Sequence, residues 1–185
     1  MVKQDKLRCF ISLNLSKNVI DKVVNIQKQI KNDKMFSGRL VEKDNLHLTL
    51  KFLGEIDSDK LNEVRKRLSE INFNQINLSF GEIGVFSKED IRIVWIKLKG
   101  ADELQKEIDN KLKGLFSIEK RFMSHITLFR VKKVYDKKRF FDHLEKIKFD
   151  KINFSADNFY LMQSCLYETG PVYSEIEKYN LESFS

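Results

Sequence analysis

Two short motifs of the same pattern contain the residues best suited to do chemistry. Each runs histidine, apolar residue, threonine, leucine, from His47 to Leu50 and from His125 to Leu128. An unperturbed histidine has a pKa of about 6.5, so near neutral pH one imidazole can accept a proton while another donates one. Threonine hydroxyls can hydrogen-bond the non-bridging oxygens of a phosphate. The pair therefore suits phosphodiester cleavage, with one histidine activating water and the other protonating the departing sugar oxygen.

Both motifs fall in segments with the period-two pattern of a half-buried β-strand, residues 46–53 and 124–131. Residues i and i+2 of a strand point to the same side, and the leucines between them face the core. We expect the two strands to meet at a cleft in which both motifs present an imidazole beside a hydroxyl. The predicted catalytic set is His47, Thr49, His125 and Thr127.

Strict alternation also assigns the residue that follows each motif. Lys51 takes the next cleft-facing place in the first strand, where its ammonium would help to hold a phosphate. Phe129 takes this place in the second strand, where its ring would narrow the cleft or stack on a base. Arg130 falls on the core-facing side and reaches a phosphate only if a bulge shifts the alternation.

A further strand is predicted over residues 7–15, with Arg8 and Phe10 on its more polar face. An aromatic ring beside a basic residue can stack on a nucleobase and contact its phosphate, so both are candidate substrate-binding residues. The alternative is that Phe10 packs within its own lobe. Trp95, in a strand over residues 91–98, is expected in the core.

Two plainer interpretations of the motifs stand beside the catalytic one. A single His-x-Thr in a strand is more often structural, and histidine is also a common metal ligand. Two matched motifs among only three histidines argue against coincidence, and the third, His143, is expected on a charged helix surface. Cys9 and Cys165 lie in apolar runs without ligand spacing. We therefore expect neither a metal nor another cofactor.

Helical and strand-like segments alternate along the chain. Apolar residues at helical spacing predict helices beginning near Ser16, Asp57 and Asp136, and another through Leu104, Ile108 and Leu112. Further strands are predicted over 76–85, 152–154, 158–166 and 172–179, with residues 86–90 as a hairpin connection. This order indicates an α+β fold of two pseudo-symmetric lobes, with helices packed outside mainly antiparallel sheet and the site in a cleft between the lobes.

Composition limits the class of protein. The chain has 185 residues, one proline and no linker-like stretch, so we expect a single domain over residues 1–185 made of two interleaved lobes. The net charge of +7 permits a polyanionic substrate without requiring one. No apolar run approaches the roughly 20 residues of a membrane span. We expect a monomeric cytoplasmic protein that does not contact membranes.

At these residues the sequence resembles the two-histidine phosphoesterase superfamily, and most closely the RNA 2′,3′-cyclic phosphodiesterases, also called 2′-5′ RNA ligase-like proteins. The segments that carry the resemblance are RCFIS at 8–12, NLHLTLKFLGE at 45–55, IVW at 93–95, RFMSHITLFR at 121–130 and GPVY at 170–173. The resemblance implies metal-independent hydrolysis of a 2′,3′-cyclic phosphate on RNA or a nucleotide to a 2′-phosphate. It also implies that His47 is the proton donor and His125 the proton acceptor, roles that the nearly equivalent motifs do not themselves distinguish. The chain departs from the family pattern at Ser124, where proline is common, and at Phe129, where a small residue is usual.

Two other functions remain open from the sequence. The same site could join tRNA halves through a 2′-5′ linkage, which is the reverse chemistry. The chain could instead be a basic RNA-binding module with little catalytic activity, although intact histidines and threonines at both motifs argue against this.

Overall fold

The structure is a computed structural model that describes residues 6–32, 34–168 and 170–183. Its strands are β1 (Leu7–Asn14), β2 (Phe36–Leu40), β3 (His47–Ile56), β4 (Ile76–Val85), β5 (Ile93–Lys99), β6 (His125–Val134), β7 (Asn153–Ala156), β8 (Asn158–Tyr167) and β9 (Gly170–Asn180). Its α-helices are α1 (Lys17–Ile30), α2 (Ser58–Ser69), α3 (Asp102–Lys111) and α4 (Lys137–Lys146), and a short 3₁₀ turn, η1 (Lys43–Asn45), precedes β3. The predicted α+β class is confirmed.

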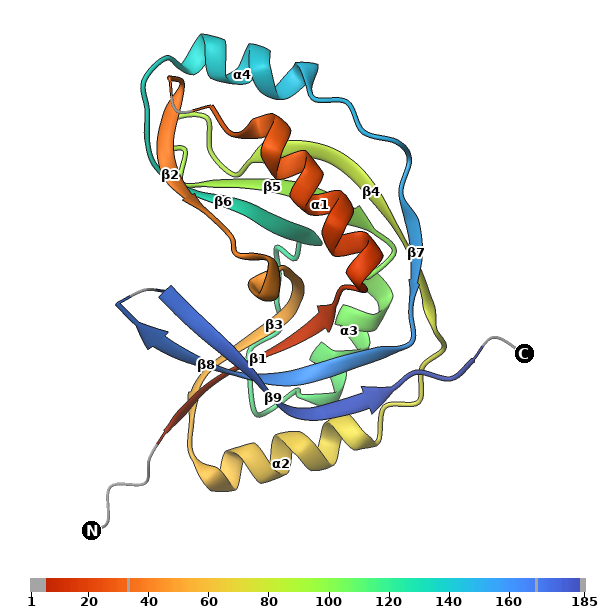
Figure 1. Cartoon of the computed structure of the whole chain (residues 1–185). Coiled ribbons are helices and arrows are strands. Elements are labelled where there is room, and N and C mark those ends of the chain that lie inside the picture. The colour runs from red at the N-terminus through yellow and green to blue at the C-terminus, as the bar shows by residue number, and fades with distance from the viewer. Residues whose placement is uncertain (1–5, 33, 169, 184–185) are drawn as a thin grey trace.

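The strands form one curled antiparallel sheet in the order β7-β4-β5-β6-β3-β1-β8-β9, with β2 paired to β6 beside β3. The two halves of this order are related by pseudo-symmetry, in which β6 corresponds to β3, β5 to β1 and β4 to β8. The helices share this symmetry: α1 lies between β1 and β3 in the chain, as α3 lies between β5 and β6. Figure 1 shows α4 and α2 at opposite ends of the molecule, with α1 and α3 between them. The two motif strands therefore meet at the centre of the sheet.

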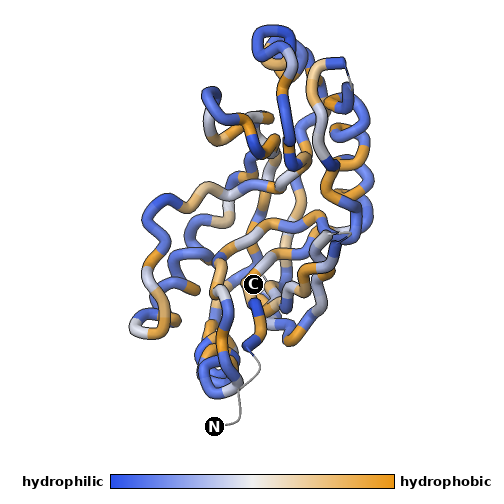
Figure 2. Tube along the Cα trace, turned by 90° about the vertical axis from the view of Figure 1, so that its left-hand side faces the viewer, coloured by the Kyte–Doolittle hydropathy of each residue, from blue (hydrophilic) through white to orange (hydrophobic). Residues whose placement is uncertain are grey.

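The helices cover the apolar face of the sheet. On α1 the predicted apolar stripe is buried, and it consists of Val19, Val23, Ile26 and Ile30. Figure 2 shows polar and apolar positions interspersed along the chain. The Asp57 and Asp136 side chains cap α2 and α4 by accepting hydrogen bonds from the backbone N–H of Lys60 and Arg139. Since leucine and isoleucine of both motifs are buried on this face, their histidines and threonines point to the opposite one.

Both motif strands contain a β-bulge at the same place. In β3, Lys51 pairs with Ile11 but Thr49 pairs with Ser12, so Leu50 has no partner of its own. In β6, Phe129 pairs with Val94 but Thr127 pairs with Trp95, so Leu128 is the extra residue. An extra residue reverses the alternation that follows it. Consequently the residue after each motif turns to the buried side, and the next one turns to the cleft.

Buried polar side chains from the helices support the two bulges. Gln27 of α1 donates from Nε2 to the carbonyl oxygens of Val41 and Leu128, both at 2.9 Å, and the second of these is at the β6 bulge. At the β3 bulge, Lys51 forms a buried ion pair with Asp109 of α3. Each helix thus holds the strand of the other half of the chain.

Two expectations from the sequence need correction. The short strand β2 was not predicted, because only Phe36 of its five residues is buried and it lacks an alternating pattern. The motif strands are also longer than predicted, since each continues past its bulge. No helix in the described part of the chain is long and apolar enough to cross a membrane.

Candidate active site

The four predicted catalytic residues come together where β3 meets β6. Leu48 pairs with Ile126 in antiparallel register. The residues on either side of this pair therefore place His47 beside Thr127 and Thr49 beside His125. Directly opposed Cβ atoms in such a pair lie roughly 4.5–5.5 Å apart, and diagonal neighbours roughly 7–8 Å apart. A phosphate between the diagonal imidazoles would be within reach of both hydroxyls.

Both imidazoles are held in the same tautomer. His47 Nδ1 lies 2.8 Å from the carbonyl oxygen of Asn45, and His125 Nδ1 lies 2.7 Å from that of Met123. A carbonyl oxygen only accepts hydrogen bonds, so Nδ1 of each ring carries the proton and donates it. The Nε2 atoms are left to exchange protons with a substrate. In the neutral ring, the Thr49 hydroxyl donates to His47 Nε2 at 2.9 Å.

The electrostatic environment favours the neutral form of both histidines. Burial lowers the pKa of His47 to about 4, and the positive charge of Arg130 and of a protonated His125 adds to this effect against the hydrogen bond to Asn45. Burial also lowers the pKa of His125, against the hydrogen bond to Met123. A bound phosphate anion would raise both pKa values, because it stabilises an imidazolium. Protonation of either imidazole would therefore be coupled to the binding of such an anion.

Arg130 is placed differently from the strict alternation. After the bulge it lies on the exposed cleft side, near enough to His47 to lower its pKa. The predicted cleft-facing positions of Phe129 and Lys51 are wrong for the same reason, because each follows a bulge. Phe129 is buried and packs edge-on against Phe36, with ring centroids 5.5 Å apart. The ammonium of Lys51 is buried against Asp109 instead of facing the cleft.

The two candidates on β1 lie in different surroundings. Phe10 is not an exposed stacking surface, because it is only 3% exposed; it packs against His47, with ring centroids 5.1 Å apart. Its ring also contacts Phe52 and Tyr173, which agrees with the alternative of packing within its own lobe. Arg8 is exposed but lies opposite Glu55. It is four residues from Ser12, the partner of Thr49, and thus roughly 13 Å along the strand from the motif.

Three aromatic residues near the histidines were not predicted as part of the site. Tyr173 of β9 packs edge-on against His47, and Phe86, after β4, packs edge-on against His125, with ring centroids 5.1 Å and 5.0 Å apart. Trp95 is buried as predicted, but it pairs with Thr127 and thus shares its face of the sheet. Among the described residues its indole Nε1 has no hydrogen-bond partner. The pairing of distant strands places these residues near the histidines, so the spacing of the motifs does not predict them.

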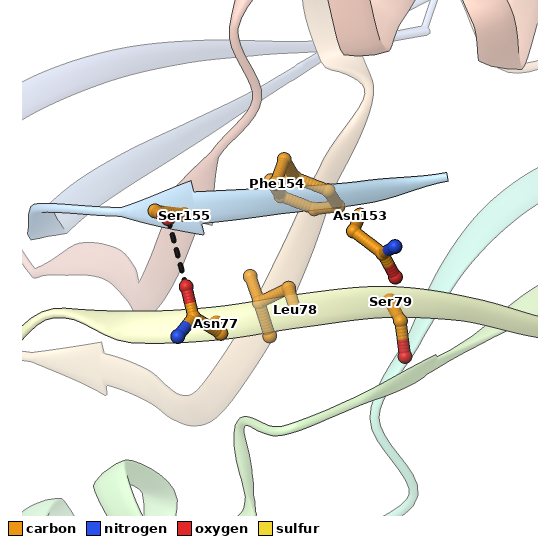
Figure 3. A pocket seen from close by; sticks show the side chains of 6 residues that line it. All are labelled: Asn77, Leu78, Ser79, Asn153, Phe154 and Ser155. Atoms are coloured by element: carbon orange, nitrogen blue, oxygen red, sulfur yellow. Dashed lines mark hydrogen bonds between the residues drawn. The ribbon is translucent and has the colours of Figure 1, made fainter. Parts of the chain in front are cut away.

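Two hollows in the surface are candidate sites. One lies beside His47, between Phe10, Asn14, Lys43 and Tyr173. The other lies over the β4–β7 pair, where Ser155 donates to the Asn77 side chain at 2.8 Å (Figure 3). Its lining residues, Asn77, Leu78, Ser79, Asn153, Phe154 and Ser155, include no group that titrates near neutral pH. Of the two, only the hollow beside His47 is lined by a histidine.

The other titratable candidates do not extend the site. His143 of α4 is half-buried rather than a surface residue, and its Nε2 donates to the carbonyl oxygens of Gln29 and Ile30 at the end of α1. Within residues 6–32, 34–168 and 170–183, no group of three or more histidine, cysteine, aspartate or glutamate side chains is arranged to hold a metal ion.

Comparison with known proteins agrees with this geometry. A model described as LigT like Phosphoesterase matches residues 13–95 and 98–173, the greater part of the chain. The chain belongs to the LigT-like phosphoesterase family. It is 35% identical to a protein named RNA 2′,3′-cyclic phosphodiesterase from Methanocaldococcus jannaschii, over 94% of this chain and 100% of that protein. It is 33% identical to the protein of the same name from Archaeoglobus fulgidus, over 92% and 98%.

Solved structures show that the fold is shared. The apo form of LigT from E. coli is 20% identical, with a TM-score of 0.77 over 96% of this chain and 99% of that one. The TT0787 protein of Thermus thermophilus is 22% identical, with a TM-score of 0.78 over 97% and 100%. The family resemblance found in the sequence is confirmed by the family model and by the relatives that are 35% and 33% identical.

Proposed function

We propose that this chain is a hydrolase that opens 2′,3′-cyclic phosphate ends of RNA to 2′-phosphates. The observation that carries the proposal is the pairing of Leu48 with Ile126, which sets two imidazoles diagonally across one site, each with its Nδ1 held by a backbone carbonyl. The name shared by relatives that align over nearly the whole chain supports the same reaction.

The chemistry follows from the positions of the side chains. His125 Nε2 accepts a proton from water as the water oxygen bonds to phosphorus. The bond from phosphorus to the 3′ oxygen breaks, and His47 Nε2 donates the proton that this oxygen needs. The assignment of donor and acceptor is part of the proposal. The hydroxyls of Thr49 and Thr127, with the guanidinium of Arg130, stabilise the charge on the non-bridging oxygens.

The surroundings of His47 are consistent with a donor that is charged only when substrate is bound. Its low pKa results from burial and from the nearby positive charges. The phosphate neutralises the effect of Arg130 and makes an imidazolium favourable. The proton thus enters the site together with the anion that uses it.

The proposal extends to the whole chain. Residues 1–185 act as one domain, and a monomer suffices for the reaction because all four motif residues come from one chain. The free thiols of Cys9 and Cys165 are consistent with a reducing compartment such as the cytoplasm.

The test is turnover of RNA ending in a 2′,3′-cyclic phosphate, with EDTA present. His47→Ala and His125→Ala should each lower kcat by about 10²–10⁴-fold, the usual contribution of one acid or base. His143→Ala is the matched control and should retain full activity. Full activity in either motif variant would overturn the proposed mechanism.

A further inference from the structure

Two arginines face each other beside the catalytic residues. Arg39 of β2 pairs directly with Arg130 of β6, and directly opposed residues of an antiparallel pair project from the same face. This is the cleft face, because Arg130 is exposed and lies near His47. Arg39 is exposed as well.

The position of β2 relates Arg39 to the reaction site. One edge of β6 is paired with β3 at Ile126 and then with β2 from Phe129 to Val134. Arg39 therefore lies on the edge of β6 that also carries β3, a few residues further along β6 than the histidine motif. Figure 1 shows the chain running from β2 through the short turn η1 directly into β3.

The arrangement is electrostatically unfavourable without an anion. Like charges directly opposite each other in a sheet repel. Neither guanidinium forms an ion pair or a side-chain hydrogen bond with any residue from the described ranges. The other neighbour of Arg130 across the strands is Ile93, so no carboxylate offsets the repulsion from that side.

We propose that Arg39 forms a second phosphate site, which binds the phosphodiester joining the last two nucleotides of the RNA. The inference rests on the proposed function, because it takes the cyclic phosphate to lie between the histidines and Arg130. The next phosphate along the strand then lies beyond Arg130, where Arg39 presents a planar donor fork suited to phosphate oxygens. Arg39 makes the enzyme prefer an oligonucleotide to a single cyclic nucleotide.

The experiment compares three substrates with the same terminal nucleotide. They are a nucleoside 2′,3′-cyclic phosphate, a dinucleotide ending in it, and the same dinucleotide with an uncharged methylphosphonate linkage. kcat/KM is measured for the wild type, Arg39→Gln and Arg39→Lys. Lys66→Gln on α2 is the control, because it removes one exposed positive charge from an outer helix.

The wild type should favour the charged dinucleotide about tenfold over the other two substrates, the value of one partly exposed charge-assisted contact. Arg39→Gln should abolish this preference and change kcat/KM on the mononucleotide by less than about twofold. The slope of log(kcat/KM) against log[salt] on the charged dinucleotide should become shallower by about 0.7, one single-strand phosphate contact. Arg39→Lys should restore part of the preference, and Lys66→Gln should keep all of it.

Two results would overturn the inference. One is an unchanged substrate preference in Arg39→Gln. The other is an equal loss on all three substrates, which would place Arg39 at the cyclic phosphate itself. A wild type that hydrolyses none of the substrates would instead overturn the proposed function, so the two failures are distinguishable.

Discussion

The buried pair of Lys51 and Asp109 gives a prediction that separates support of the fold from substrate binding. The two side chains are 5% and 4% exposed. Asp109 also accepts hydrogen bonds from Gln105 Nε2 at 2.8 Å and from the backbone N–H of Glu119 at 2.9 Å, and Lys51 donates to the carbonyl of Ser117 at 2.7 Å. Burial alone would raise the pKa of Asp109, but these hydrogen bonds and the ammonium hold it below its ordinary value.

The cost of breaking the pair follows from this burial. Asp109→Leu leaves an ammonium in an apolar site, and Lys51→Met leaves a carboxylate there. Each should lower the free energy of unfolding by about 3–5 kcal/mol, the usual penalty for removing one partner of a buried ion pair. The double variant replaces both charges by apolar groups, so its loss should fall short of the sum of the two by at least about 3 kcal/mol.

The assay is urea denaturation of the wild type, both single variants and the double variant. Arg67→Met with Glu63→Leu is the control cycle, because that pair is partly exposed and should show coupling below about 1 kcal/mol. Folded Lys51→Met should retain kcat/KM within about threefold, since its ammonium does not face the cleft. Additive losses at the buried pair, or a hundredfold loss of activity in folded Lys51→Met, would refute this account.

Three further predictions concern the cleft. Arg130→Gln should lower kcat/KM by about 10–100-fold, because a charge-assisted phosphate contact is lost. It should also raise the pKa of His47 in an NMR titration, because a positive charge is removed. Lys132→Gln is the control at an exposed neighbour and should change neither quantity. The low pKa of His47 means that the unfolded chain binds a proton below about pH 6.5 while the folded chain does not until about pH 4. Lowering the pH from 7 to 4.5 should therefore cost the wild type about 2 kcal/mol more unfolding free energy than His47→Gln, measured in urea, and equal losses would contradict it. Tyr173→Leu should leave stability within about 1 kcal/mol yet lower kcat by disordering His47, and unaltered kinetics would show that its edge-on contact does not position the ring.

Alternation in the sequence was enough to predict the motif strands and the four residues that meet at the cleft. It failed immediately after each motif, because a bulge changes the phase of the side chains. The signal is nevertheless present, since the buried apolar residues that continue each strand, Leu53 and Val131, lie three positions after Leu50 and Leu128 instead of two or four. Both strands have this irregular spacing, and in β6 it places Arg130, instead of Phe129, on the side of the cleft.

Other parts of the site depend on pairing between distant segments. Tyr173 and Phe86 reach the histidines from β9 and from the residue after β4. Neither segment has a motif that specifies its neighbours. The strand β2 has little apolar pattern because it is mostly exposed, and Arg39 gains meaning only from its register with Arg130.

The most direct test of the central claim is the fate of the phosphorus–oxygen bonds in one turnover. RNA ending in a 2′,3′-cyclic phosphate is incubated with the protein in ¹⁸O-labelled water and EDTA, and the product is identified by ³¹P NMR and mass spectrometry. Two histidines working as acid and base on opposite sides of the phosphate predict one ¹⁸O atom in a terminal 2′-phosphate. A 3′-phosphate would contradict the proposed orientation, and a cyclic end that stays intact would contradict the reaction itself.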